Sequence, residues 1–177
     1  MDRPKQEETF PLDLAVNSIN YYLTHKTYLP VPLDVPELFR HKAGAFVTLK
    51  KRGELRGCIG TIVSTKSSLA EEIIYNAVSS ALHDPRFPPV RLEELPELTI
   101  SVDVLDKPEP VRTIQELDPK IYGVIVHTED KSGLLLPDLE GVKTPEQQID
   151  IARQKAGISR NEKFKMQRFK VNRYGKK

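Results

Sequence analysis

The segment Leu55-Arg56-Gly57-Cys58-Ile59-Gly60 holds the chain's one cysteine between two glycines and close to an arginine. Side chains two apart on a strand share a face, so Arg56 and Cys58 are predicted to be neighbours. A nearby cation stabilises the thiolate, the reactive form of cysteine, so Arg56 is expected to lower the pKa of the thiol. Glycine within a strand marks a bulge or the close approach of a ligand or another backbone. We therefore predict Cys58 and Arg56 as catalytic residues, with Gly57 and Gly60 at the substrate. An inert, packed Cys58 is the alternative.

A second segment, His83-Asp84-Pro85-Arg86-Phe87-Pro88-Pro89, is stiffened by three prolines. In a functional interpretation Asp84 or His83 acts as general base, and Arg86 binds a carboxylate or phosphate through two hydrogen bonds. In a structural interpretation Asp84 and Arg86 form an ion pair that fixes the loop, and Phe87 fills the core. The candidate roles are catalysis for Asp84 and substrate binding for Arg86.

Other kinds of site have no signal in this sequence. The motifs of phosphate-binding loops, dinucleotide sites, zinc proteases and serine hydrolases do not occur. One cysteine and four dispersed histidines offer no zinc-ligand spacing, so we predict neither a metal nor a cofactor. Gly57-Cys58-Ile59-Gly60 matches the G-x-x-G loop of KH domains, but those domains place it between helices and here it falls in a predicted strand.

Composition favours one compact domain over residues 1–177. The 177 residues are 38% hydrophobic and 29% charged, which is ordinary globular usage. No apolar run approaches the roughly 20 residues that cross a bilayer, and the polar start of the chain lacks a secretory signal. We expect a cytoplasmic protein whose first 10 or 11 residues and last few residues are flexible.

Charge is unevenly distributed along the chain. From Arg160 onward there are eight Lys or Arg and one acid, a net +7, so a total of +2 leaves −5 for the remainder. This basic segment could touch RNA or an acidic partner. The alternative is a solvated edge strand that its lysines protect from pairing with another sheet.

The elements that position these residues follow from periodicity and from helix-capping residues. Pro11 is expected in the first turn of the first helix, and Ser68 with Glu71 fits a capping box. The predicted helices cover residues 11–25, 68–82 and 144–156, and the predicted strands cover 45–49, 54–63, 98–104, 124–128, 134–136 and 163–171. Strands joined by short turns are antiparallel, so the fold class is α+β, a mostly antiparallel sheet flanked by helices.

Three segments in this order and spacing resemble the AMMECR domain family, over about residues 12 to 174. They are Leu55–Gly60, Asp84–Pro89 and Gly133-Leu134-Leu135-Leu136-Pro137. The resemblance implies an α+β fold with a larger and a smaller subdomain and a cleft between them near the cysteine segment. It implies no particular reaction. It does imply association with a Memo-like protein of the dioxygenase-like class and with a radical-SAM enzyme, and hence a modification pathway.

Three hypotheses for function stay open. In the first, the chain is an enzyme or enzyme component in which Cys58 is a nucleophile or covalent carrier and Asp84 and Arg86 orient the substrate. In the second, it is a non-catalytic module that binds a protein or RNA through the basic segment. In the third, it is a structural subunit that pairs through sheet edges. Polar groups converging on an accessible Cys58 would favour the first, and a packed Cys58 beside an open basic face would favour the second.

Overall fold

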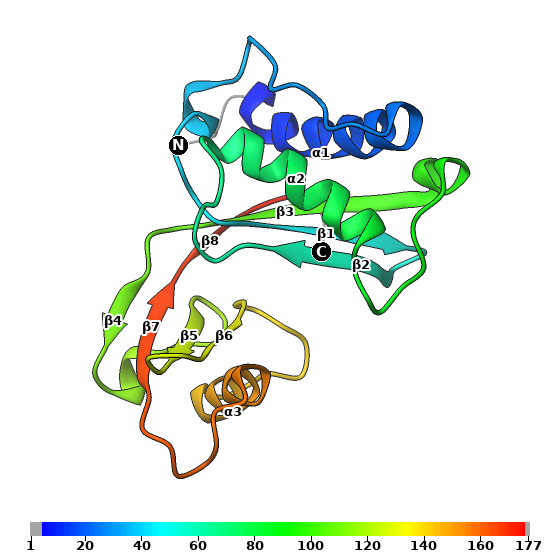
Figure 1. The fold of residues 1–177 in the computed structure, drawn as a ribbon. Coiled ribbons are helices and arrows are strands. Elements are labelled where there is room, and N and C mark those ends of the chain that lie inside the picture. Colours follow the sequence, from blue (N-terminus) through cyan, green and yellow to red (C-terminus); the bar gives the residue numbers. More distant parts are fainter. Residues whose placement is uncertain (1–4, 176–177) are drawn as a thin grey trace. The chain divides into compact units, whose positions relative to one another are not determined.

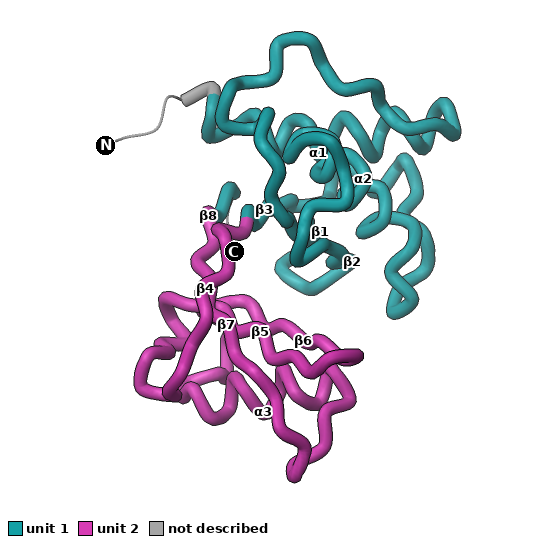
Figure 2. The backbone as a smooth tube through the Cα atoms, turned by 60° about the vertical axis from the view of Figure 1, so that its left-hand side comes forward, with its two compact units in different colours: residues 1–104, 173–177 teal, residues 105–172 magenta. Residues whose placement is uncertain are grey.

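The computed structural model describes residues 5–175, which form two compact units (Figures 1 and 2). The first unit comprises the chain up to Val104 and from Arg173 on, and the second comprises Leu105–Asn172. Over the described residues the fold is α+β, with two four-stranded antiparallel sheets and three α-helices, which confirms the predicted class. The predicted cleft between a larger and a smaller part, and the single domain over 1–177, stay predictions.

The first unit is a sheet with helices on one of its faces (Figure 1). Its strand order is β2-β1-β3-β8, where β1 is Ala45–Lys51, β2 is Glu54–Gly60, β3 is Leu98–Leu105 and β8 is Val171–Tyr174. Alternate residues of β1, from Ala45 to Leu49, are completely buried against α2 (Leu69–Leu82). In turn, α2 packs on α1 (Lys5–His25). The opposite face of the sheet carries the intervening residues, among them Phe46, Thr48 and Cys58.

The second unit repeats this pattern on a smaller scale. Its strand order is β4-β7-β5-β6, where β4 is Glu109–Val111, β5 is Gly123–His127, β6 is Ser132–Leu135 and β7 is Lys165–Phe169. The helix α3 (Pro145–Ala156) packs on β5 and β6, and a separate apolar cluster forms between them. Short 3-10 helices occur at Glu37–Phe39 (η1), Leu92–Glu97 (η2) and Ile114–Glu116 (η3). None of the helices between residues 5 and 175 is long and apolar enough to cross a membrane.

The first helix starts earlier than the sequence indicated. It begins at Lys5, so Pro11 lies inside it and not in its first turn. Pro11 supplies no backbone N–H at this point. The preceding turn of the helix packs on the core through Phe10, whose ring centroid lies 5.0 Å from that of Phe39. Residues 5–10 are therefore helical, and the remaining ends predicted to be flexible, 1–4 and 176–177, lie outside the described residues.

Two strand boundaries were also wrong. β2 ends at Gly60 and not at Val63, because Ser64, Thr65 and Lys66 donate to the Glu72 carboxylate of α2 and so leave the sheet. The single strand predicted over 163–171 is two strands separated at Lys170, and each belongs to a different sheet. Phe169 is buried in the second unit and Tyr174 in the core of the first, so each strand follows its own apolar anchor.

Candidate active site

A β-bulge in β2 changes which residues accompany the thiol. Leu49 of β1 pairs with Gly57, but the next residue, Lys50, pairs with Leu55, so Arg56 is an extra residue without a partner. The alternation of side chains is interrupted there. The prediction that Arg56 and Cys58 are neighbours on one face was therefore wrong.

Arg56 clamps the segment that follows α2. Its Nε and Nη2 donate to the Glu94 carboxylate at 3.3 and 3.0 Å, and its Nη1 donates to the Pro88 carbonyl at 2.9 Å. Lys51 adds a second cation 3.3 Å from Glu94. The hydrogen bonds to Glu94 lower its pKa to about 2, and those from Arg56 have the largest effect. The guanidinium of Arg56 is thus committed to Glu94 and to the loop, and not to the thiol.

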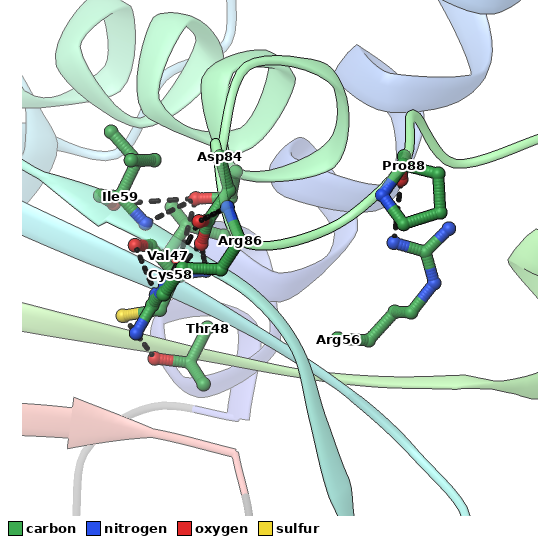
Figure 3. Close-up of polar contacts among 9 residues, drawn as sticks. Val47, Thr48, Arg56, Cys58, Ile59, Asp84, Arg86 and Pro88 are labelled. Carbon is green, nitrogen blue, oxygen red and sulfur yellow. Dashed lines mark hydrogen bonds and ion pairs between the residues drawn. The ribbon is translucent and has the colours of Figure 1, made fainter.

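Cys58 sits on the outer edge strand of the first sheet with polar groups around it (Figure 3). The side chain is half-buried, and its Sγ lies 3.2 Å from the Thr48 hydroxyl on the neighbouring strand. Its backbone N–H donates to Asp84 Oδ2 at 2.9 Å, and its carbonyl accepts from Arg86 Nη2 at 3.3 Å. Asp84 and Arg86 therefore satisfy the Cys58 backbone as a neighbouring strand would.

The predicted Asp84–Arg86 ion pair is confirmed. Arg86 donates its Nε to Oδ1 at 2.9 Å and its Nη2 to Oδ2 at 2.7 Å, and its backbone N–H adds a third bond at 3.1 Å. Asp84 is 4% exposed, and the hydrogen bonds from Arg86 hold its pKa far below the ordinary value. A carboxylate that stays ionised and accepts several hydrogen bonds is a poor general base, so the geometry gives Asp84 the task of holding Arg86.

The pKa of the Cys58 thiol is raised and not lowered. Burial is the main cause, and the carboxylates of Asp103 and Asp84 act in the same direction. The Thr48 hydroxyl and the Arg86 guanidinium oppose it, because each stabilises a thiolate. The cation that acts on the thiol is thus Arg86, from the second motif, and the expectation that Arg56 lowers the pKa of Cys58 was wrong.

Asp103 is a member of this site that the sequence interpretation did not identify. It is 3% exposed and forms an ion pair with Arg173, with contacts of 2.6 and 2.8 Å. In the predicted strand over 98–104, Asp103 alternates with Val102 and Val104, so the alternation alone indicates a polar face. A signal was available, because an aspartate flanked by Val102 and Val104 must find a partner if both faces of the strand are buried.

The two glycines of the motif have packing roles. A Cβ on Gly57 would overlap the carbonyl oxygen of Ser80 in α2, so the helix backbone lies directly on the strand there. A Cβ on Gly60 would overlap the ring of Phe46. Contact of either glycine with a substrate stays a prediction.

Phe87 is half-buried, and its ring centroid lies 5.5 Å from the guanidinium carbon of Arg86. The prediction that Phe87 fills the core was therefore wrong.

The sequence also gave no sign that Glu72 is fully buried in α2. Its carboxylate accepts from the backbone N–H groups of Thr65 and Lys66 and from the hydroxyls of Thr61 and Ser64. This fixes the loop between β2 and α2.

Ser68 caps α2 as predicted, because its hydroxyl accepts from the Glu71 backbone N–H. The Glu71 carboxylate accepts from Ser67 and not from Ser68, so the capping box is incomplete.

Comparison with known proteins places this site within a family. Residues 12–177 match the AMMECR1 family, and this range contains the cysteine segment, the proline-rich segment and Gly133–Pro137. The chain belongs to the AMMECR1 family. The predicted resemblance is confirmed.

Relatives of this AMMECR1 chain occur in bacteria and archaea. A protein of Thermotoga maritima is 52% identical over 163 residues, which cover 90% of this chain and 94% of that protein. A protein of Clostridium acetobutylicum is 49% identical over 172 residues, which are 96% of this chain but 36% of that longer protein. The crystal structure of an uncharacterised protein of Pyrococcus horikoshii superposes with a TM-score of 0.87 at 31% identity, covering 96% of this chain and 91% of that one.

Proposed function

We propose that this AMMECR1 chain is an enzyme, or a component of one, whose reacting group is the Cys58 thiol. One observation carries the proposal: thiolate-stabilising groups from two separate segments converge on a thiol that is only half-buried. The Thr48 hydroxyl of β1 lies 3.2 Å from Sγ. Arg86, in the loop after α2, donates to the Cys58 carbonyl, and its charge acts on the thiol. An inert structural cysteine is usually surrounded by apolar groups.

Each residue then has a distinct task. Cys58 gives up its proton to solvent, and its sulfur, as nucleophile or covalent carrier, bonds to an electrophilic carbon of the substrate. The bond from that carbon to the leaving group breaks, and the leaving group departs with the electron pair. Arg86 and Thr48 stabilise the thiolate when the proton leaves. Asp84 is a positioning residue that orients Arg86, and Arg56 positions the loop through Glu94 and Pro88. Burial raises the pKa of the thiol and so favours its protonated form.

We place this reaction in a modification pathway that also involves a Memo-like protein and a radical-SAM enzyme. Membership of the AMMECR1 family supports this placement by analogy. A Memo-like protein or radical-SAM enzyme from the same organism should co-elute with the chain and slow alkylation of Cys58. Separate elution together with an unchanged alkylation rate would remove these partners from the proposal.

The second candidate function, binding of RNA or a protein through the basic segment, has weaker support from the contacts. Arg168 donates to the Glu116 carbonyl at 2.7 Å and forms an ion pair with Glu109 at 3.4 Å. Arg173 is paired with Asp103. Two cations of the basic segment are therefore engaged within the chain. RNA binding would show a steep loss of affinity with salt, and a slope that flattens in the double variant of Arg168 and Lys170 to Gln.

The test of the thiol proposal is the pH dependence of Cys58 alkylation in the folded protein. We expect complete reaction without unfolding, and an apparent pKa above the ordinary value of about 8.5. Arg86→Gln should raise this pKa further, because it removes the cation that acts on the thiol. Arg56→Gln should change the thiol pKa much less, and Arg52→Gln, at the exposed hairpin turn, is the matched loss of one charge. A thiol that reacts only after unfolding would overturn the proposal.

A further inference from the structure

The guanidinium of Arg86 has N–H donors that form no hydrogen bond with the described residues. Of its five N–H donors, Nε and Nη2 are used by Asp84, and Nη2 also donates to the Cys58 carbonyl. Within residues 5–175, Nη1 donates no hydrogen bond. The Arg86 side chain is 55% exposed, and its two Nη1 N–H groups have no hydrogen-bond acceptor among the described residues.

These free donors belong to a guanidinium that is held in place. Its anchor, the Asp84 side chain, is 2% exposed and also accepts the backbone N–H groups of Cys58 and Arg86. The anchor is thus attached to the same strand residue whose side chain is the thiol. Because the guanidinium is already fixed, a ligand that binds it orders little further side chain, which favours affinity.

We propose that the Nη1 end of Arg86 binds an oxyanion group of the substrate, a carboxylate or a phosphate, and holds it beside the Cys58 thiol. This inference rests on the proposed thiol chemistry and names its substrate class. Nη1 shares the guanidinium carbon with Nη2, which lies 3.3 Å from the Cys58 carbonyl oxygen. An oxyanion there would present the rest of its molecule near Sγ.

Charge around the site is balanced. The two carboxylates that act on the thiol, Asp84 and Asp103, are each paired with an arginine, Arg86 and Arg173. Net attraction for an anion is therefore small, and recognition depends on the geometry of the Nη1 donors. Arginine presents a planar fork that lysine lacks, so Arg86→Lys should lose binding although it keeps the charge.

Two alkylating reagents that differ in one group test this inference. Iodoacetate and iodoacetamide both react as the thiolate sulfur attacks the CH₂ carbon, forming the C–S bond while the C–I bond breaks and iodide leaves. Only iodoacetate carries a carboxylate. The ratio of the two rate constants, at fixed pH and ionic strength, reports recruitment of the anion independently of the thiol pKa, because both reagents meet the same thiolate.

We expect the iodoacetate-to-iodoacetamide ratio to fall about three- to ten-fold in Arg86→Gln and in Arg86→Lys, the range for losing a charge-assisted hydrogen bond at a half-exposed site. It should be unchanged in Arg52→Gln. In the unsubstituted protein, acetate or inorganic phosphate at constant ionic strength should slow iodoacetate more than iodoacetamide. The stronger of these two competitors identifies the substrate's group as carboxylate or phosphate.

Two results would overturn the inference. If the ratio is the same with and without Arg86 and neither anion competes, Arg86 is no oxyanion receptor, while a thiol that still reacts in the folded protein keeps the proposed function. If neither reagent reacts until the protein unfolds, the proposed function fails and the receptor fails with it.

Discussion

The hairpin β1–β2 of the first unit and the hairpin β5–β6 of the second are built in the same way. In each, the second strand contains a glycine beneath a helix: Gly57 lies under the Ser80 carbonyl of α2, and Gly133 lies under the Ala152 carbonyl of α3. In each, that second strand is at the edge of its sheet. Absence of a side chain is required in both places because a helix backbone occupies its position.

The residues after these glycines differ. Gly133 is followed by Leu134 and Leu135, which are 8% and 3% exposed. Gly57 is followed by Cys58, whose backbone is bound by the Asp84–Arg86 pair. The glycines of the two edge strands thus report the close approach of a helix and not a reactive site. What distinguishes the first hairpin is the Asp84–Arg86 pair, which comes from another part of the chain and binds the Cys58 backbone.

Adding a methyl group at either glycine should have the largest effect. Gly57→Ala and Gly133→Ala should each lower the free energy of unfolding by about 3 kcal/mol or more, since the new Cβ would overlap a backbone carbonyl that cannot move alone. Denaturant unfolding measures both. Gly57→Ala should also change the rate of Cys58 alkylation, and Gly133→Ala should leave it unchanged.

The control for backbone conformation is Gly141→Ala. Gly141 has a φ of +83° and no heavy atom within 4 Å of an added Cβ, so this variant should cost only about 1 kcal/mol. If the alanine variants of Gly57, Gly133 and Gly141 all lose the same stability, the close approach of a helix backbone does not explain why the first two positions require glycine.

Removing the carboxylate of Asp84 should have the next largest effect. Asp84→Asn leaves Arg86 without its counter-ion and weakens the bond to the Cys58 N–H, so we expect a loss of about 2 kcal/mol at neutral pH. The folded pKa of Asp84 is depressed, so its contribution is complete above the unfolded value of about 3.9 and is lost as pH falls below it. The two proteins should therefore converge in stability in acid.

Thermal unfolding from pH 7 to pH 2 measures this convergence. Glu162→Gln, which breaks the Lys131–Glu162 pair of the second unit, is the matched control. At neutral pH it should reduce stability less than Asp84→Asn does, because both partners are more exposed than Asp84. A difference between Asp84→Asn and the unsubstituted protein that persists unchanged at pH 2 would contradict the role of the ionised carboxylate.

Local signals predicted most of the fold. Alternation identified β3, and the apolar spacing identified α2. The helix predicted over 144–156 is α3, which begins after the cap at Thr144 and ends at the left-handed Gly157, with φ of 67°. Each of these features depends on residues within a turn or two of one another, so short-range patterns contain them.

The arrangement of the site depends on long-range contacts that such patterns do not contain. One unpaired residue, Arg56, interrupts the alternation of β2, and no propensity marks a bulge at an arginine. The charge that acts on Cys58 comes from Arg86, 28 positions along the chain, and Arg173 reaches Asp103 across 70 positions. The two motifs could be recognised separately, but their pairing required the fold.

The smallest expected effect concerns the hydroxyl beside the thiol. Thr48→Val keeps the shape of the side chain but removes the oxygen 3.2 Å from Sγ. Because that hydroxyl lowers the thiol pKa against burial, its loss should raise the pKa further. Alkylation at pH 8 should then slow by about two- to three-fold, as a pKa change of less than one unit predicts. Thr128→Val is the matched control: it removes a hydroxyl that donates to Asp130 at 2.9 Å, just after β5 in the second unit, and it should leave the rate unchanged. If Thr48→Val reacts at the original rate, the hydroxyl has no part in the chemistry, and the difference between the two hairpins reduces to the Asp84–Arg86 pair.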